Sequence, residues 1–175
     1  MTILINAGHS EIDCGAVGRT GLKEADVNMN IAICVQRYLK DKGIESYIIR
    51  QDKSLFDVIR YCNTYSKDYE FAVSIHCNAA ETGHAHGTET LYYPTSKRGK
   101  EIAQCIQNEL VKTVGLRDRG IKARKDLAFL KKIRKTSVLV ECAFISNLRE
   151  EKMLKENYDL FAQGIANGII KYMKK

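Results

Sequence analysis

Short apolar runs alternate along the chain with longer segments in which apolar residues recur every three or four positions. The short runs predict strands over residues 2–6, 44–50, 71–76, 87–93 and 137–144. The longer segments predict helices over residues 24–42, 54–67 and 97–114 and a helical region over 147–173. This alternation is typical of α/β proteins, so we expect one domain with a twisted, mostly parallel but mixed sheet of about six strands and helices on both faces.

The segment 24–42 illustrates the helical pattern. Gly43 follows it, at the position where a helix end favours a residue that tolerates positive φ. We expect the apolar stripe of this helix to face the sheet, and its members are Val27, Ile31, Ile33, Cys34, Val35, Tyr38 and Leu39.

The region 115–135 differs from the rest because it lacks long apolar runs and is rich in arginine and lysine. It predicts a loop with one or two short strands, and loops at the edge of an α/β sheet often hold substrate. The chain contains no internal repeat, low-complexity stretch or proline-rich linker. Residues 1–175 therefore read as a single domain.

The composition adds a basic charge to this picture. The formal net charge is +7, which favours polyanions such as nucleic acid, anionic membranes or an acidic cell wall, or else reflects a solvated lysine-rich surface. Because basic residues are spread along the chain without interleaved aromatics, we do not expect nucleic-acid binding. No long apolar segment predicts membrane insertion, and none opens the chain as a signal peptide would.

Six cysteines lie far apart and form no C-x-x-C pair. This spacing favours neither a structural zinc site nor a redox motif. Several of the cysteines fall in apolar stretches, where a reduced thiol packs as a small apolar group. We therefore expect free thiols and folding in a reducing cytosol.

Two of the four histidines directly follow predicted strands, and this placement suggests a metal site. His9 comes after the first strand and His76 ends the third, and the ends of parallel strands converge at one edge of a sheet. A catalytic zinc ion takes three protein ligands, and two histidines with one glutamate are an established set. Glu24, at the start of the first helix, is the candidate carboxylate, although such a glutamate can instead complement the helix dipole.

Glu141 stands inside the apolar run 137–144. Burying a carboxylate is costly unless it is paired, hydrogen-bonded or protonated, so Glu141 is either functional or part of a buried ion pair. Beside an activated water, such a carboxylate can accept a proton and later donate it to a leaving amine.

Four ordered segments resemble the zinc-dependent N-acetylmuramoyl-L-alanine amidases of the amidase-3 type, and the resemblance runs from residue 2 to residue 172. These segments are NAGHSEIDCGAVGRTGLKEADVN, SIHCNAA, GTETLYY and SVLVECAFISNLREE. The resemblance implies that His9, Glu24 and His76 bind Zn²⁺ and that Glu141 is the catalytic glutamate. Smaller features that also agree are Arg50, Asp52, Arg60, Asn63 and Asn78.

The resemblance implies hydrolysis of the amide bond between N-acetylmuramic acid and L-alanine in peptidoglycan. Two alternatives remain open: a zinc peptidase that cuts the stem peptide, and a noncatalytic module that binds the wall. The sequence departs from the family at the loop 6–11 and before the last strand, at Thr136 and Ser137. These changes affect loops and leave the four implied site residues in place.

Other candidate residues carry less information. Leu127, and Asn78 just past the second histidine, are candidates for substrate contact. His84 and His86 form an H-A-H segment that could line the cleft or bind a second metal, but exposed loop histidines are common and we favour that interpretation.

The setting follows from the resemblance and the missing signal peptide. We expect the catalytic domain of a phage endolysin, made in the host cytoplasm, exported through holin pores and acting on the bacterial cell wall. A sporulation amidase shares these traits. In either case, a C-terminal wall-binding domain could belong to a longer natural chain.

Overall fold

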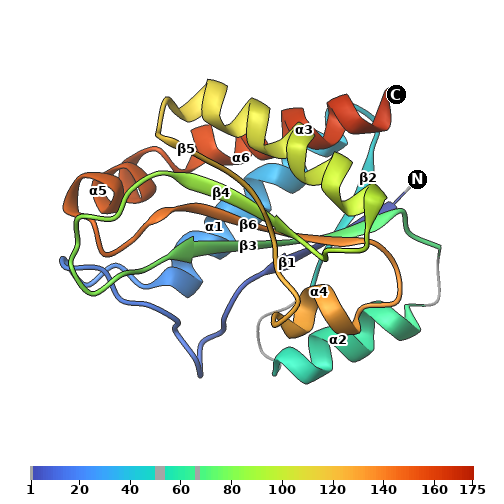
Figure 1. The fold of residues 1–175 in the computed structure, drawn as a ribbon, viewed down its shortest axis with the longest axis horizontal. Helices are drawn as coiled ribbons and strands as arrows, with labels where there is room; N and C mark the ends of the chain where they lie inside the picture. The colour runs from blue at the N-terminus through green and yellow to red at the C-terminus, as the bar shows by residue number, and fades with distance from the viewer. Residues whose placement is uncertain (1, 50–53, 66–67) are drawn as a thin grey trace.

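A six-stranded sheet lies at the centre of the computed structural model, which describes residues 2–49, 54–65 and 68–175 (Figure 1). The strands are β1 (Thr2–Ala7), β2 (Glu45–Ile49), β3 (Phe71–Asn78), β4 (Thr88–Tyr92), β5 (Asp118–Ala123) and β6 (Ser137–Phe144). The helices are α1 (Glu24–Lys40), α2 (Leu55–Thr64), α3 (Lys97–Val114), α4 (Ala128–Lys132), α5 (Leu148–Glu156) and α6 (Tyr158–Met173).

The sheet is mixed, with the strand order β2-β1-β3-β6-β4-β5. Strands β2, β1, β3 and β6 are parallel, whereas β4 runs antiparallel to β6 and parallel to β5. The loop 79–87 between β3 and β4 is too short for a parallel crossover, so β4 returns in the opposite direction. The carboxyl ends of β1, β3 and β6 therefore share one edge with the amino ends of β4 and β5.

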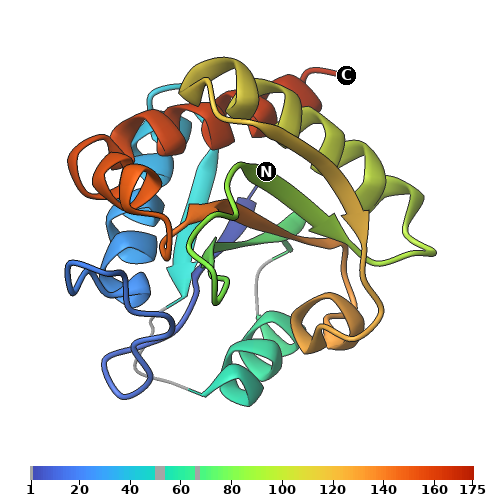
Figure 2. The same ribbon diagram turned by 60° about the vertical axis from the view of Figure 1, so that its left-hand side comes forward.

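Helices cover both faces, as the sequence predicted. Figure 2 shows α1, α3 and α6 on one face and the shorter α2 and α4 on the other. Successive side chains of β3 point to opposite faces of the sheet and so pack into two hydrophobic cores. Phe71 and Val73 belong to the larger core, and Ala72 belongs to the smaller one. Near the ends of β3 and β6, the polar residues His76 and Glu141 lie on the same face of the sheet as Ala72 and Leu139, toward α2 and α4.

Helix α1 confirms the predicted element and its end. Gly43 has φ 71°, the left-handed conformation expected after the helix. One member of the predicted apolar stripe is wrong, because Ile33 is 52% exposed. Ile33 lies two positions beyond the buried Ile31, about 200° around the helix, and so points to solvent.

The region 115–135 contains the predicted short strand as β5, but the remainder is not all loop. Helix α4 was missed, and it buries Phe129 and Leu130 against the sheet. Five residues are too few for a helical period to be recognised. The predicted 147–173 region is two helices that meet at Asn157. Predicted elements 44–50 and 54–67 end at Arg50 and Lys67, which lie outside the described residues.

The cysteines are free thiols, five of them buried and Cys14 partly exposed. Among the described residues, no helix combines the length and apolar character that crossing a membrane requires.

Candidate metal centre

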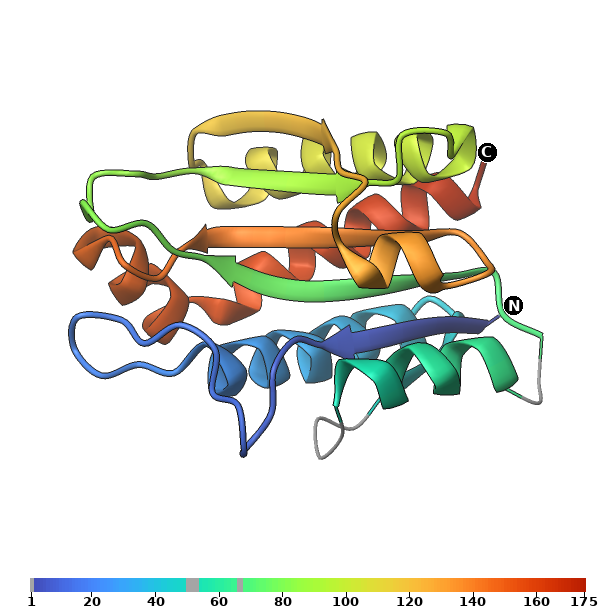
Figure 3. The ribbon, with the colours of Figure 1, turned by 60° about the horizontal axis from the view of Figure 1, so that its bottom comes forward.

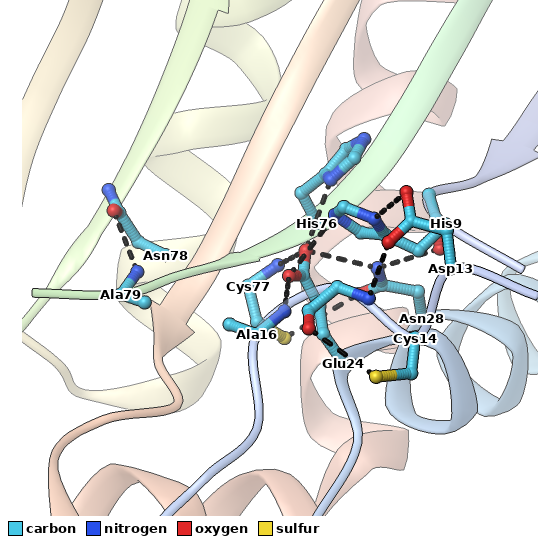
Figure 4. Close-up of polar contacts among 12 residues, drawn as sticks. His9, Asp13, Cys14, Ala16, Glu24, Asn28, His76, Cys77, Asn78 and Ala79 are labelled. Atoms are coloured by element: carbon cyan, nitrogen blue, oxygen red, sulfur yellow. Dashed lines mark hydrogen bonds and ion pairs between the residues drawn. The ribbon is translucent and has the colours of Figure 1, made fainter. Parts of the chain in front are cut away.

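Three elements bring His9, Glu24 and His76 together at one edge of the sheet. His9 follows β1, Glu24 is the first residue of α1 and His76 lies near the end of β3. One ligand atom from each residue lies within 4.8 Å of the other two (Figure 4). The three residues that the sequence predicted as metal ligands therefore form one cluster.

His9 adopts a left-handed backbone conformation with φ 67°, the one such non-glycine residue among those described. This conformation costs free energy for a residue with a Cβ and often marks functional sites. The His9 and His76 rings lie edge to face, with centroids 5.1 Å apart.

The Glu24 carboxylate lies between the two imidazoles. Its Oε2 is 3.2 Å from His9 Nε2, and its Oε1 is 3.1 Å from His76 Nδ1. Backbone amides also hold the carboxylate, because Ala16 N–H donates to Oε2 and Cys77 N–H donates to Oε1, both at a distance of 3.0 Å. Glu24 is 3% exposed, so this carboxylate is buried yet fully partnered.

The cluster changes the proton affinity of its members. Burial raises the pKa of Glu24, but the hydrogen bonds from His76 and His9 outweigh it and leave the pKa well below its usual range. The hydrogen bond to Glu24 raises the pKa of His9 to about 9, against the opposing effect of burial. Without a cation in the cluster, the fold therefore favours a carboxylate paired with imidazolium, and a bound cation would replace that positive charge.

Glycines and outer partners shape the surroundings of the cluster. A Cβ on Gly8 would lie 2.2 Å from the His76 ring, and one on Gly15 would lie 2.6 Å from the His9 ring. Asp13 Oδ2 lies 3.3 Å from His9 Nδ1, an outer carboxylate of the kind that orients a metal-binding imidazole. The two imidazoles, the carboxylate and their outer partner fit the requirements of a catalytic zinc site.

Glu141 lies beside the cluster on the neighbouring strand. It is in register with His76 across β3 and β6, so both side chains extend from the same face of the sheet. Its Oε2 is buried and has no hydrogen-bond partner among the described residues. Burial raises the pKa of Glu141 to about 7, as required of a group that accepts and returns a proton near neutral pH.

Sequence reasoning missed Glu89, which continues this row onto a third strand. Glu89 is in register with Glu141 across β6 and β4 and is 8% exposed. Arg119 Nε donates to Glu89 Oε2 at 2.8 Å, and Asn78 Nδ2 donates to Glu89 Oε1 at 3.3 Å. An acid inside the short strand run 87–93 was the available signal, the same one that drew attention to Glu141.

A cleft of about 420 Å³ opens beside the cluster on the face of α2 and α4. Both His9 and His76 line it, and so does Leu127 at the start of α4. Asn78 is outside this lining and is engaged with Glu89. The rest of the lining is mixed, with six apolar residues, Ile12, Leu55, Val58, Ala128, Phe129 and Leu139, and five polar ones, Asn6, Ser10, Asp13, Ser54 and Ser74.

The remaining candidates lie elsewhere. His84 and His86 are exposed in the loop 79–87 and belong to no metal cluster within the described part of the chain. Asn63 joins α2 to the end of α4, because its amide donates to Lys132 O and accepts from Arg134 N–H. Arg60 pairs with Asp57 on the surface of α2. Arg50 and Asp52 lie outside the described residues.

Comparison with known proteins identifies a family. The family model described as N-acetylmuramoyl-L-alanine amidase matches residues 3–171. The amidase LytC of Bacillus subtilis is 34% identical over 99% of this chain, which spans 36% of that relative's length. A germination-specific N-acetylmuramoyl-L-alanine amidase of the same species is 28% identical over 97% of this chain and 78% of its own length.

Solved structures agree in fold. An N-acetylmuramoyl-L-alanine amidase from Clostridium difficile 630 superposes with a TM-score of 0.92 and 32% identity, covering 99% of this chain and 97% of that one. The catalytic domain of the CD27L endolysin, which targets the same species, gives a TM-score of 0.82 and 27% identity, covering 98% and 97%. Family match, relatives and fold agree, and the chain belongs to the N-acetylmuramoyl-L-alanine amidases.

Proposed function

We propose that this chain is a zinc-dependent catalytic domain that hydrolyses the amide bond between the lactyl group of N-acetylmuramic acid and L-alanine in peptidoglycan. His9, Glu24 and His76 hold the zinc ion, and Glu141 is the general base and acid. The observation that carries the proposal is the convergence of these three ligands at a cleft that both histidines line, with the buried Glu141 in register with His76 on the neighbouring strand.

Zinc in such a site supplies Lewis acidity toward a carbonyl oxygen and lowers the pKa of a water molecule. The protein side chains supply the remaining requirements. Glu24 is held by two backbone amides, so its oxygens stay fixed between the imidazoles. Glu141 accepts a proton from the attacking water and donates it to the departing amine of L-alanine. The products are a muramic acid carboxylate and a free stem peptide.

The cleft lining supports a peptide substrate. Its apolar residues suit the small methyl side chains of alanine, and its polar residues can hydrogen-bond a peptide backbone. Leu127 contacts the stem peptide in this proposal because it lines the cleft together with both histidines. Asn78 contributes to substrate binding less directly, through its contact with Glu89 beside Glu141.

Metal analysis tests the ligand assignment. The purified chain is expected to hold one zinc ion and to lose muropeptide hydrolysis on chelation, with activity restored by added zinc. Glu24→Ala should abolish both zinc retention and activity, whereas alanine at the exposed Glu81 should leave them unchanged. Hydrolysis that persists without metal would contradict the proposal, and wall binding without hydrolysis would support the noncatalytic alternative.

The proposed setting is lysis of the bacterial wall by a phage endolysin made in the host cytoplasm and exported through holin pores. A further wall-binding domain would accompany the catalytic unit in a longer chain. The chain's 36% share of LytC is consistent with that arrangement. Turbidity loss on a panel of cell walls, with and without chelator, checks the lytic activity and identifies the susceptible wall type.

A further inference from the structure

The segment Ser146–Glu151 closes the fourth family motif but takes no part in the proposed chemistry. Its polar side chains bind the backbone of two loops that flank the metal centre. Figure 3 shows α5, which this segment begins, at the same end of the sheet as the loops after β1 and β3. We propose that Glu151 is a positioning residue that fixes the loop before Glu24 and thereby tunes zinc binding, an inference that rests on the proposed function.

Glu151 contacts the tip of the loop 16–23. Its Oε1 accepts a hydrogen bond from Thr20 N–H at 2.9 Å and another from the Thr20 hydroxyl at 2.7 Å. The residue is 1% exposed, and a Cβ on Gly18 would lie 2.2 Å from this same oxygen. A side chain at position 18 would therefore displace the Glu151 carboxylate.

The loop passes this restraint on to the metal ligand. Gly18 N–H donates to Leu22 O at 2.8 Å, and Val17 and Lys23 form an antiparallel β-bridge. Residues 17–23 are therefore a small hairpin. At the base of the hairpin, Glu24 N–H donates to Ala16 O, and Ala16 N–H donates back to Glu24 Oε2. A displacement at Thr20 would therefore reach the ligand oxygen through the backbone of this hydrogen-bonded hairpin.

The neighbouring side chains hold the other loop, which separates their roles from that of Glu151. Asn147 Nδ2 donates to Gly83 O and Ala85 O, and Glu150 Oε1 accepts from Gly87 N–H. Glu150 therefore restrains the loop after β3, whereas Glu151 alone among the acids of this segment contacts the loop before Glu24.

One feature of Glu151 distinguishes it from a contact that only adds stability. Its second oxygen, Oε2, is buried without a hydrogen-bond partner among the described residues. Leaving a buried carboxylate oxygen unpartnered is unfavourable, so stability alone does not favour glutamate here. Fixing the hairpin that ends at a metal ligand gives this residue a separate role.

The test compares zinc and cobalt binding by the intact chain and its variants. Glu151→Ala and Gly18→Ala should each weaken Zn²⁺ affinity about tenfold or more, measured by competition with a chromophoric chelator. Both should also change the visible absorption of the Co²⁺-loaded protein, because the geometry of the ligands changes. Glu151→Gln keeps an acceptor for Thr20 and should restore most of the affinity. Glu156→Ala, at the exposed end of the same helix, is the matched control.

Wild-type Zn²⁺ affinity and an unchanged Co²⁺ spectrum in folded Glu151→Ala would overturn the inference. If that variant does not fold, as judged by circular dichroism, Gly18→Ala decides by the same two measurements, because it keeps the carboxylate and only displaces it. The proposed function is judged separately, on the wild-type chain. A wild type that binds zinc but does not release L-alanine-terminated peptides contradicts the function and leaves the affinity ratios to decide the role of Glu151.

Discussion

At the residue scale, the site combines groups whose proton affinities are shifted in opposite directions. Glu24 stays ionised between two imidazoles, whereas Glu141, one strand away, has a raised pKa because it is desolvated. The two carboxylates are therefore suited to different tasks, one to binding a cation and the other to transferring a proton.

Glu141→Gln is expected to keep zinc and to lower turnover by about a hundredfold or more, because the amide cannot accept the proton of the attacking water. Zinc content and the rate of muropeptide hydrolysis, measured on the same samples, check the retained zinc and the lowered turnover. A variant with undiminished turnover would remove Glu141 from the mechanism.

The same variant should change how stability depends on pH. Desolvation raises the pKa of Glu141 from its ordinary value of 4.5 to about 7 in the folded protein. Protonation therefore favours the folded state, and this contribution is complete below pH 4.5 and is lost as pH rises through 7. Through this group, metal-free wild-type protein should lose about 1–3 kcal/mol of stability between acidic and alkaline pH, and Glu141→Gln should not show that loss. Urea unfolding at pH 5 and pH 8 measures this change in stability. An equal change for wild type and Glu141→Gln would contradict the assignment.

Zinc affinity should rise with pH. The hydrogen bond to Glu24 raises the pKa of His9 to about 9 in the metal-free protein, and a proton on that imidazole competes with the metal. Zn²⁺ titrations between pH 6 and pH 9 should show about a tenfold gain in affinity per pH unit, levelling near the His9 pKa. An affinity that is constant over this range would mean that His9 is not a ligand.

At the element scale, register across the sheet explains how distant residues meet. His76, Glu141 and Glu89 occupy matched positions on β3, β6 and β4, so their side chains form a row on one face. The opposite wall of the cleft depends on α4, a five-residue helix that cannot be stable by itself. Its position depends on its buried side chains and on Asn63.

Asn63→Ala should loosen this wall, because it removes the hydrogen bonds that join α2 to Lys132 and Arg134 at the end of α4. We expect a loss of about 1 kcal/mol in the free energy of unfolding and a higher KM with a smaller change in kcat. Chemical denaturation and steady-state kinetics measure these changes. Asn108→Ala, at an exposed position on α3, is the control. Equal effects of both substitutions would show that the α2–α4 link does not shape the cleft.

The sequence predicted the long elements because their apolar periods are strong, as in α1 and β3. It missed α4, whose length hides any period, and it assigned Ile33 to the core because the apolar residues of α1 extend beyond the buried face. Spacing suggested His9 and His76 as a pair, since both follow strands. The start of the first helix suggested Glu24 as the carboxylate, and the family resemblance favoured a metal ligand over a residue that only complements the helix dipole. Glu89 was missed because strand order and register, which place it next to Glu141, are not visible in a sequence.

At the scale of the whole molecule, the net charge of +7 favours encounter with an acidic cell wall. Hydrolysis of intact walls should therefore slow severalfold as salt rises from about 0.05 to 0.5 M, since the Debye length falls well below 10 Å. Hydrolysis of a small soluble muropeptide should change little under the same conditions. Equal salt dependence on both substrates would show that the charge does not assist wall association.

Mass spectrometry of purified peptidoglycan digested by the zinc-loaded chain shows which bond the proposed zinc centre cuts. If it cuts between muramic acid and L-alanine, we expect free stem peptides with an N-terminal L-alanine and glycan chains with unsubstituted lactyl carboxylates, both absent after chelation. Stem peptides cut internally while still attached to the glycan would contradict the proposed cleavage and would identify a zinc peptidase.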